Sequence, residues 1–278
     1  MKKIIVFLIA VGVVSITSCK QNKSNEAPTE ETAEVAAFKL HGEDVMYATD
    51  STNLKGYIAF NENQEAKRPG ILIVHEWWGH NDYVRKRADM LAELGYTAIA
   101  VDMYGDGKLA AHPEDAGKFA GSVFANIPEA TARFNAALNL LKEHPTVDTD
   151  KIGAIGYCFG GSVVLTMANA GADLDAVAAF HSGVQLPIMP NEKLTANVLV
   201  CNGADDPFIN PESIVAFKSA MDSVGAKYQY IAYPGVKHSF TSKEADANGE
   251  KFGLPLAYDA DADQQSWASM QKLFKEAF

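Results

Sequence analysis

The sequence has little of what marks several classes of protein. Three cysteines among 278 residues are too few, and odd in number, for a disulfide framework. Lysine and arginine total 24 against 35 aspartates and glutamates, and the net charge of −11 argues against a nucleic-acid partner, which would require a basic face. With 47% hydrophobic residues, the bulk of the chain is too apolar to be disordered or fibrous. The length fits one large α/β domain or two small ones.

Several motifs that carry cofactors are also missing. The seven histidines show no H-E-x-x-H spacing, so we expect no zinc or other metal. No G-x-G-x-x-G and no phosphate-binding loop follows a predicted strand, so we expect no cofactor. Cys158 has no second cysteine at redox spacing, which excludes thioredoxin-like chemistry. The chemistry therefore has to come from the side chains of the protein itself.

The N-terminus carries a targeting segment. Lys2 and Lys3 precede an apolar run over residues 4–14, which is short for a membrane-spanning helix. The small residues directly before Cys19 resemble the lipobox of a bacterial lipoprotein signal. The resemblance implies that residues 1–18 are a signal peptide that is removed and that Cys19 becomes the lipidated N-terminus. The alternatives are an ordinary secretory signal or a single N-terminal anchor.

A polar stretch over residues 19–37 follows and is expected to be a tether between the membrane and the domain. Lipid on Cys19 would anchor the protein in the bacterial cell envelope, on the periplasmic side. Lys20 after the cysteine resembles the enterobacterial sorting signal that favours the outer membrane over the inner one. Residues 38–278 are expected to form one domain and to be monomeric.

Within this domain, apolar strands alternate with amphipathic helices. Two short alternating runs at residues 44–48 and 54–60 predict an antiparallel hairpin at a sheet edge. Helices are predicted over residues 82–94, from residue 128, over 211–224 and at the C-terminus, and further strands at residues 70–75, 97–101, 152–156, 176–180, 198–201 and 228–232. This alternation predicts an α/β fold with a mostly parallel central sheet and helices on both faces. Ligands then bind at the carboxyl ends of the strands.

One strand end carries a candidate nucleophile. The residues from Gly156 to Gly161 form G-x-C-x-G, the nucleophile-elbow pattern with cysteine in place of serine. The elbow would place Cys158 at the N-terminus of a helix, where the helix dipole favours a thiolate. The alternative is a buried structural cysteine, because cysteine is among the most buried residue types. Cys201, inside a predicted strand, is expected to be such a buried residue.

Two later strand ends carry a candidate acid and a candidate base. Asp205 and Asp206 follow one strand, and the G-x-x-D-x-x-aliphatic pattern that starts at Gly203 selects Asp206. His238 lies on the loop after the last strand. Either residue alone could be a turn or surface residue. The chain order of nucleophile, acid and histidine, however, is that of α/β-hydrolases.

A fourth segment, from His75 to His80, follows the first buried strand. Main-chain N–H groups from this loop and from the residue after the nucleophile form the oxyanion hole in such enzymes, and here these residues are Trp77 and Phe159. Glu76 is unexpected, because an acid there would repel a developing negative charge. It must therefore have another partner, or be an exposed loop residue.

These four segments together resemble the dienelactone hydrolase (carboxymethylenebutenolidase-like) family of α/β-hydrolases. The resemblance implies an α/β-hydrolase fold, with Cys158 as nucleophile, His238 as base and acid, and Asp206 as the residue that orients the imidazole. It also implies that Glu76 contacts the resting thiol and takes its proton. The expected reaction is hydrolysis of a small ester or lactone through an acyl-cysteine. A non-catalytic ligand-binding lipoprotein and a glycan-directed carbohydrate esterase are the alternatives.

The sequence departs from the founding members of that family in one respect. They hold the substrate carboxylate with two arginines, whereas the matching segments here contain Lys108, Lys118 and Lys243. Lysine lacks the bidentate fork of arginine, which argues against dienelactone itself as the substrate. Residues 106–126 are expected to cap the site. The predicted pocket is apolar and lined by Trp78, Tyr104, Tyr157, Phe208 and Phe240.

Overall fold

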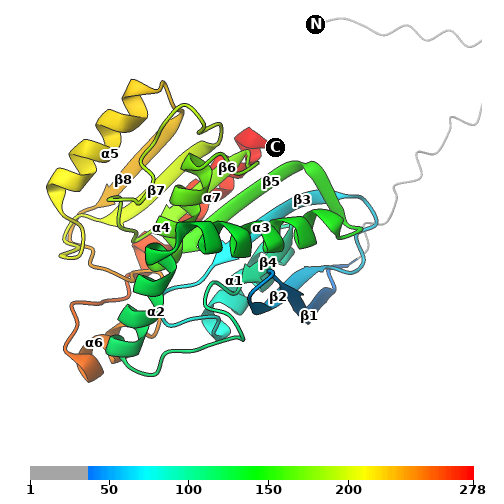
Figure 1. The fold of residues 1–278 in the computed structure, drawn as a ribbon, viewed down its shortest axis with the longest axis horizontal. Helices are drawn as coiled ribbons and strands as arrows, with labels where there is room; N and C mark the ends of the chain where they lie inside the picture. The colour runs from blue at the N-terminus through cyan, green and yellow to red at the C-terminus, as the bar shows by residue number, and fades with distance from the viewer. Residues whose placement is uncertain (1–36) are drawn as a thin grey trace, which may run out of the picture. The chain divides into compact units, whose positions relative to one another are not determined.

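The computed structural model describes residues 37–278, which contain one eight-stranded sheet with helices on both faces (Figure 1). The strands are β1 Leu40–Ala48, β2 Asn53–Asn61, β3 Arg68–Val74, β4 Thr97–Val101, β5 Val147–Tyr157, β6 Ala176–Phe180, β7 Asn197–Gly203 and β8 Tyr228–Tyr233. The helices are α1 Asp82–Glu93, α2 Pro113–Ala125, α3 Ile127–Glu143, α4 Phe159–Asn169, α5 Pro211–Ser223, α6 Ala245–Phe252 and α7 Ala260–Ala277. The predicted signal peptide and nearly all of the predicted tether lie outside the described residues.

The strand order is β1-β2-β4-β3-β5-β6-β7-β8. The hairpin of β1 and β2 is antiparallel and lies at one edge, with Leu40 opposite Asn61 and Ala48 opposite Asn53. From β4 to β8 every neighbouring pair is parallel. The predicted mostly parallel sheet and its edge hairpin are confirmed. All carboxyl ends of the parallel strands consequently lie at the same end of the sheet, where the predicted catalytic residues also lie.

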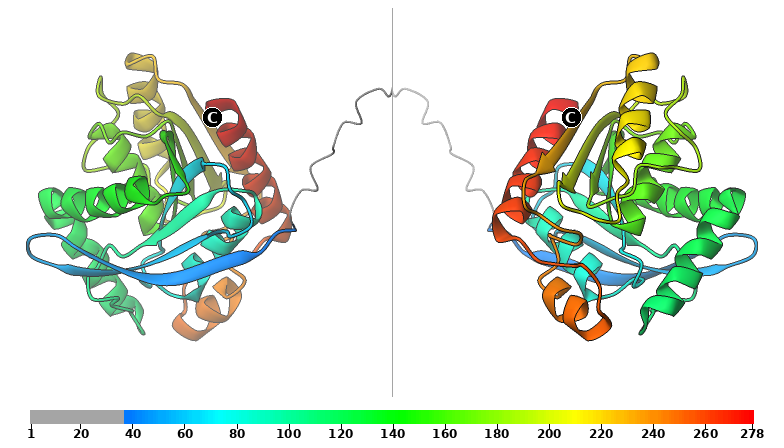
Figure 2. Two further views of the ribbon diagram at one scale, coloured as in Figure 1. Left: turned by 90° about the vertical axis from the view of Figure 1, so that its right-hand side faces the viewer. Right: turned by 90° about the vertical axis from the view of Figure 1, so that its left-hand side faces the viewer.

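The sheet separates two hydrophobic cores because alternate strand residues point to opposite faces. In β3, Leu72 and Val74 join the core under α3, α4 and α5, whereas Ile71 and Ile73 join the core under α1 and α7. Figure 2 shows α3 and α7 on opposite sides of the sheet. Burying each such side chain contributes about 1.5–3 kcal/mol, so the central strands provide a rigid base for the loops that follow them.

The predicted helices are present, but two helices were not predicted as such. Helix α2 lies inside the segment expected to be a cap, and α6 lies between the His238 loop and α7. Helix α6 buries only Ala245 and Gly249, so it has no apolar stripe from which a helix could be recognised. Strand β5 begins at Val147, five residues before the predicted start at residue 152. This earlier part was not predicted because most of its residues are polar and lack strand alternation.

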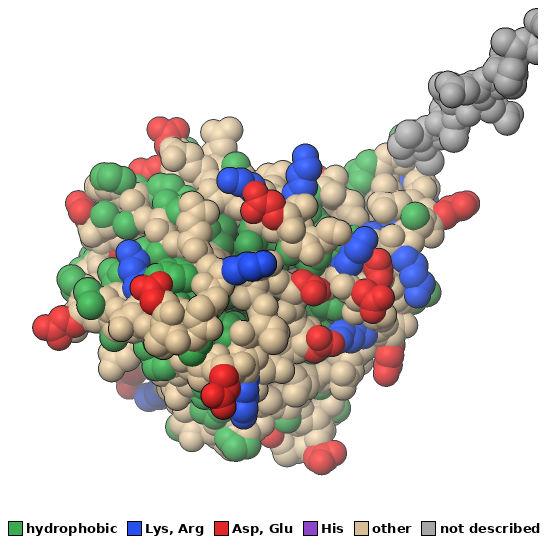
Figure 3. Space-filling view, turned by 90° about the horizontal axis from the view of Figure 1, so that it is seen from above, with side chains coloured by type: hydrophobic (Ala, Val, Ile, Leu, Met, Phe, Trp, Pro, Cys, Tyr) green, Lys and Arg blue, Asp and Glu red, His purple; other side chains and the backbone are tan. Residues whose placement is uncertain are grey.

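The surface of residues 37–278 carries charges of both signs. On the face shown in Figure 3, acidic and basic side chains are interspersed rather than gathered by sign. In this described part of the chain, no helix is long and apolar enough to span a membrane.

Candidate active site

Cys158 lies at the sharp turn between β5 and α4. Its main chain has φ 53° and ψ −117°, a strained conformation that a non-glycine residue adopts only where its surroundings enforce it. The turn also needs glycine on both sides. A Cβ on Gly156 would lie 2.1 Å from the carbonyl oxygen of Gly160, and a Cβ on Gly160 would lie 2.3 Å from that of Val74. The local sequence therefore forms an elbow that presents the thiol at the N-terminus of α4.

The structure brings Cys158, His238 and Asp206 together from the ends of three strands. His238 Nε2 lies 3.1 Å from Cys158 Sγ, and His238 Nδ1 lies 2.6 Å from Asp206 Oδ2. The main-chain N–H of Phe208 donates to the other carboxylate oxygen of Asp206 at 2.9 Å. Asp205, the alternative acid, is exposed and takes no part in this contact. His238 thus lies between a thiol and a carboxylate.

Electrostatics at His238 favour its charged form. Burial alone would lower the pKa of this imidazole, because burial disfavours a charge. The negative charge of a Cys158 thiolate and the hydrogen bond to Asp206 outweigh burial and raise the pKa of His238 to about 10. The contacts therefore favour the charged imidazolium form of His238.

The two residues predicted to supply the oxyanion donors lie beside the thiol. Trp77 and Phe159 both line the cavity that contains Cys158. Within residues 37–278, neither of their N–H groups donates a hydrogen bond to another main-chain group. Donors of this kind are typically worth about 3–4 kcal/mol in a transition state.

Glu76 is buried beside this site, with 4% of its surface exposed. Burial raises the pKa of its carboxyl group to about 7, although His238 and Ser239 oppose the shift. Its Oε1 accepts a hydrogen bond from Ser239 Oγ at 3.2 Å. The resemblance implies contact between Glu76 and the resting thiol, whereas here the thiol is turned toward His238 and the carboxyl group bonds to Ser239.

The cavity at Cys158 has a volume of about 190 Å³ and a mostly apolar wall. In the part of the chain that the structure describes, no lysine or arginine lines it, and no group of His, Cys, Asp and Glu is arranged to hold a metal ion. Lys108, Lys118 and Lys243, from the segments that hold arginines in the founding members, contribute nothing to its wall. The lining residues are Trp77, Cys158, Phe159, Ser162, Gly183, Phe208, His238 and Leu256.

Four of the five predicted pocket residues do not line this cavity; Phe208 does. Tyr157 precedes the nucleophile, so strand alternation directs its side chain into the opposite core, where it stacks on Phe180 with 4.8 Å between ring centroids. Phe240 is fully buried in that same core. Each lies within two residues of a catalytic candidate along the chain, but this proximity does not fix the face to which the side chain points.

The other two predicted pocket residues have different surroundings. Trp78 lines a separate polar cavity, with its ring 5.7 Å from that of Phe252 in α6. Tyr104 is buried, and its hydroxyl donates a hydrogen bond to the carbonyl oxygen of Trp77 at 2.9 Å. It therefore contacts the loop that carries Trp77 without lining the cavity.

Residues 106–126, which were expected to cap the site, do not line the cavity at Cys158. Helix α2 contributes no lining residue to the cavity at Cys158. Phe119 of α2 packs on Tyr104, and Phe124 packs on Phe159, with ring centroids 5.4 Å and 5.2 Å apart. The aromatic side chains of this segment therefore pack into the core, where they contact Tyr104 and the cavity-lining Phe159.

Sequence analysis missed several residues around the site. Leu256 lies on the loop after α6 and pairs with His238 through an isolated β-bridge, a contact with no signal in the sequence. His181 is fully buried with its ring 5.3 Å from that of His238, and its Nε2 contacts Thr241 Oγ1 at 2.7 Å. Its position directly after β6, at the same edge of the sheet, was the signal that could have identified it.

The sequence profile of the dienelactone hydrolase family matches residues 54–278. The chain belongs to the dienelactone hydrolase family. It is thus a hydrolase of the dienelactone hydrolase class with an α/β-hydrolase fold.

Individual relatives cover most of the chain. Protein usf of Aquifex pyrophilus is 28% identical over 240 residues, which are 84% of this chain and 98% of that protein. A relative from Aquifex aeolicus, named as a candidate carboxymethylenebutenolidase, is 27% identical and covers 74% of this chain and 89% of its own length. The solved structure of a dienelactone hydrolase-like promiscuous phosphotriesterase from metagenomic libraries is 33% identical, with a TM-score of 0.80, and covers 86% of this chain and 99% of that one.

Proposed function

We propose that this dienelactone hydrolase family member cleaves uncharged esters or lactones through a covalent acyl-cysteine at Cys158. The observation that supports the proposal most strongly is the continuous contact from Sγ to His238 at 3.1 Å and from His238 to Asp206 at 2.6 Å. This contact lies beside a cavity with two free N–H donors. Together these groups are the nucleophile, base, orienting acid and oxyanion donors that acyl transfer needs.

The first half-reaction acylates the enzyme. The Cys158 thiolate attacks the carbonyl carbon, and the N–H groups of Trp77 and Phe159 stabilise the resulting oxyanion. When the tetrahedral intermediate collapses, the bond to the leaving alkoxide breaks and a thioester remains. The alkoxide takes the proton from Nε2 of His238, which becomes neutral, while Asp206 keeps its hydrogen bond to Nδ1.

The second half-reaction releases the acid. Neutral His238 takes a proton from a water molecule, whose oxygen attacks the thioester carbon. The second tetrahedral intermediate collapses with the Cys158 thiolate as leaving group. The carboxylic acid is released, and the thiolate and the imidazolium are restored, so the proton balance closes.

The cavity wall selects the substrate class. Because no lysine or arginine lines the cavity, a substrate carboxylate would be desolvated there without a partner. We therefore expect uncharged aryl or alkyl esters and uncharged lactones to be preferred over anionic lactones. Phosphotriesters, which are also uncharged, are a second candidate class, since the metagenomic relative is described as a promiscuous phosphotriesterase.

We also propose that the protein is anchored in the bacterial envelope through lipid on Cys19, facing the periplasm and preferring the outer membrane. This proposal rests on the resemblance of residues 1–19 to a lipoprotein signal and on Lys20 after the cysteine.

Steady-state kinetics of the full chain test the enzymatic proposal. The substrates are an uncharged aryl ester, an uncharged lactone, an anionic lactone, an acetylated glycan and a phosphotriester. We expect turnover of the uncharged ester or lactone, with kcat reduced by about 10³-fold or more in Cys158→Ala. Full activity of Cys158→Ala would sink the mechanism. Binding without turnover would favour the non-catalytic lipoprotein, and turnover of the glycan alone would favour the carbohydrate esterase.

A further inference from the structure

His75 forms a hydrogen bond with the carbonyl oxygen of the peptide unit that carries the Trp77 N–H group. In a trans peptide the C=O and N–H groups point in opposite directions, and residues 37–278 contain no cis peptide bond. The carbonyl oxygen of Glu76 belongs to the same peptide unit as the Trp77 N–H. It lies 2.5 Å from His75 Nδ1 and accepts a second bond from the N–H of Gly79 at 3.2 Å. Fixing this oxygen fixes the direction of the N–H.

The surroundings of His75 define its tautomer. The main-chain N–H of Met103 donates to His75 Nε2 at 3.3 Å, so this nitrogen must be an acceptor. Nδ1 therefore carries the proton and donates a hydrogen bond to the main-chain carbonyl oxygen of Glu76. The ring is fully buried, and burial lowers the pKa of His75 to about 4, so the neutral form persists at neutral pH.

The peptide unit on the other side of Trp77 is held as well. Tyr104 donates from its hydroxyl to the Trp77 carbonyl oxygen at 2.9 Å. The rings of His75 and Tyr104 also pack on Phe159, with centroids 5.7 Å and 5.4 Å away. Phe159 supplies the second N–H donor of the site, so one aromatic cluster contacts the residues of both donors.

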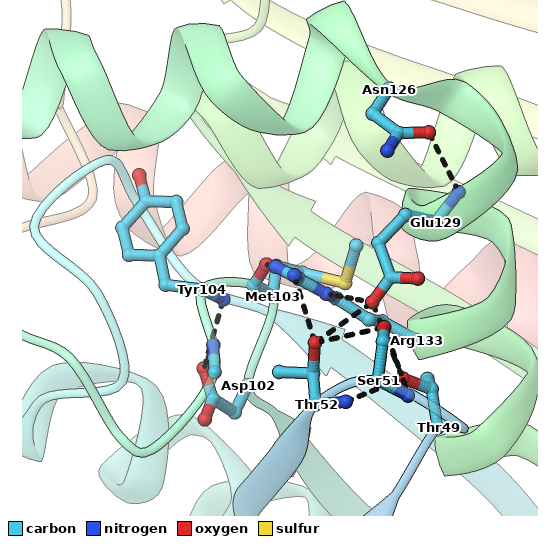
Figure 4. Close-up of polar contacts among 10 residues, drawn as sticks. Thr49, Ser51, Thr52, Asp102, Met103, Tyr104, Asn126, Glu129 and Arg133 are labelled. Atoms are coloured by element: carbon cyan, nitrogen blue, oxygen red, sulfur yellow. Dashed lines mark hydrogen bonds and ion pairs between the residues drawn. The ribbon is translucent and has the colours of Figure 1, made fainter.

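The segment that presents Met103 and Tyr104 is itself fixed on two sides (Figure 4). Asp102 Oδ1 accepts hydrogen bonds from the N–H groups of Tyr104 at 2.9 Å and Gly105 at 2.8 Å. From α3, Arg133 donates to the carbonyl oxygen of Met103 at 2.8 Å. The cluster that contacts the oxyanion donors is therefore tied to the turn after β4 and to α3.

We propose that His75 and Tyr104 are positioning residues that aim the Trp77 N–H group at the oxyanion of the transition state. The proposal rests on the function proposed above. It assigns to these two side chains a role that acts on the rate of acyl transfer, because a donor helps only where the oxyanion will form. Packing alone would require neither the Tyr104 hydroxyl nor a donor at Nδ1.

Tyr104→Phe tests the proposal, because it removes one oxygen and keeps the ring. We expect kcat for an uncharged aryl ester to fall about tenfold, less than the loss of a whole donor, with KM within about twofold. The rate of Cys158 alkylation by iodoacetamide should stay within about twofold, since alkylation forms no oxyanion. Cys201 is fully buried, and mass spectrometry of the peptide that contains Cys158 separates its alkylation from that of Cys19.

Tyr57→Phe is the matched control. The Tyr57 hydroxyl donates to Asp89 at 2.7 Å, between β2 and α1, and Tyr57 does not line the cavity at Cys158. We expect this variant to lose one hydrogen bond and to keep kcat, KM and the alkylation rate. An equal fall of kcat in both variants would show that any lost tyrosine hydroxyl has this effect, and would overturn the proposal.

A pair of His75 variants tests the other contact. In His75→Asn the side-chain amide places an N–H donor at the position of Nδ1, whereas His75→Phe keeps a ring without a donor. We expect the asparagine variant to retain at least about tenfold more kcat than the phenylalanine variant. If His75→Phe does not fold, Tyr104→Phe and His75→Asn still decide the matter.

The outcomes separate this proposal from the function on which it rests. If Cys158→Ala remains active, the proposed mechanism fails. If Cys158→Ala is inactive while Tyr104→Phe has an unchanged kcat, or loses kcat and alkylation rate in parallel, the positioning role alone is wrong.

Discussion

At the scale of single residues, Glu76 has the environment least suited to its charge. Its carboxyl group is buried and has Ser239 as its hydrogen-bond partner. Because burial raises its pKa to about 7, the folded protein binds a proton here at pH values where the unfolded chain has released it. The contribution of Glu76 to stability is therefore complete below about pH 4.5 and is lost as pH rises through about 7.

Glu76→Gln should remove this dependence. A rise in the pKa of Glu76 from the ordinary glutamate value of 4.5 to about 7 corresponds to roughly 3 kcal/mol. The wild type should therefore lose up to about that much free energy of unfolding between about pH 4.5 and 7.5, relative to the variant. Urea unfolding of both proteins at several pH values in this range measures the difference. If the stability of both proteins changes with pH in the same way, Glu76 has the same pKa in the folded and the unfolded protein, which would contradict this prediction.

Residue positions at strand ends could be predicted, but side-chain directions could not. Cys158, Asp206 and His238 each follow a strand with a recognisable pattern, and parallel strands bring their carboxyl ends together. Tyr157 and Phe240 lie within two residues of catalytic candidates but point into the opposite core. Their direction depends on strand alternation and loop geometry, which spacing along the chain does not reveal.

At the scale of elements, the elbow between β5 and α4 depends on close backbone packing. At Gly160 an added Cβ would meet the carbonyl oxygens of Val74, the last residue of β3, and of His75, in the loop that carries Trp77. Neither main-chain atom can move without disturbing the site. The glycine is therefore required by its neighbours in space.

Gly160→Ala and Gly117→Ala should have opposite effects. Alanine at Gly160 should lower the free energy of unfolding by about 3 kcal/mol or more, because something in the packed backbone must shift. Alanine at Gly117, in α2 with nothing within 4 Å, should raise it by about 0.5–1 kcal/mol through helix propensity. Thermal or urea unfolding measures both changes. A Gly160→Ala protein as stable as Gly117→Ala would contradict the structure of the elbow.

The strands and most helices could be predicted because their hydrophobic periods are strong. Helix α6 could not, since it buries few side chains and is held by contacts with distant loops. Leu256, which follows α6, reaches the cavity through its bridge to His238. Part of the cavity wall thus depends on tertiary contacts that no local pattern encodes.

At the scale of the whole molecule, the proposed attachment to a membrane rests on residues outside the described part of the chain. If lipid on Cys19 is the anchor, Cys19→Ala should move the full-length protein out of the membrane fraction. Fractionation of cells that express either form, with incorporation of labelled fatty acid as a second readout, measures this. A variant that stays with the membrane unlabelled would indicate an uncleaved N-terminal anchor instead.

The central claim is that Cys158 becomes acylated during turnover. Mass spectrometry of the rapidly acid-quenched full chain, mixed with an uncharged aryl ester, tests it most directly. The proposed mechanism predicts one acyl group on the peptide that contains Cys158, formed within the first turnover and absent in Cys158→Ala. Steady release of product with no acyl group on that peptide, and undiminished in Cys158→Ala, would contradict it.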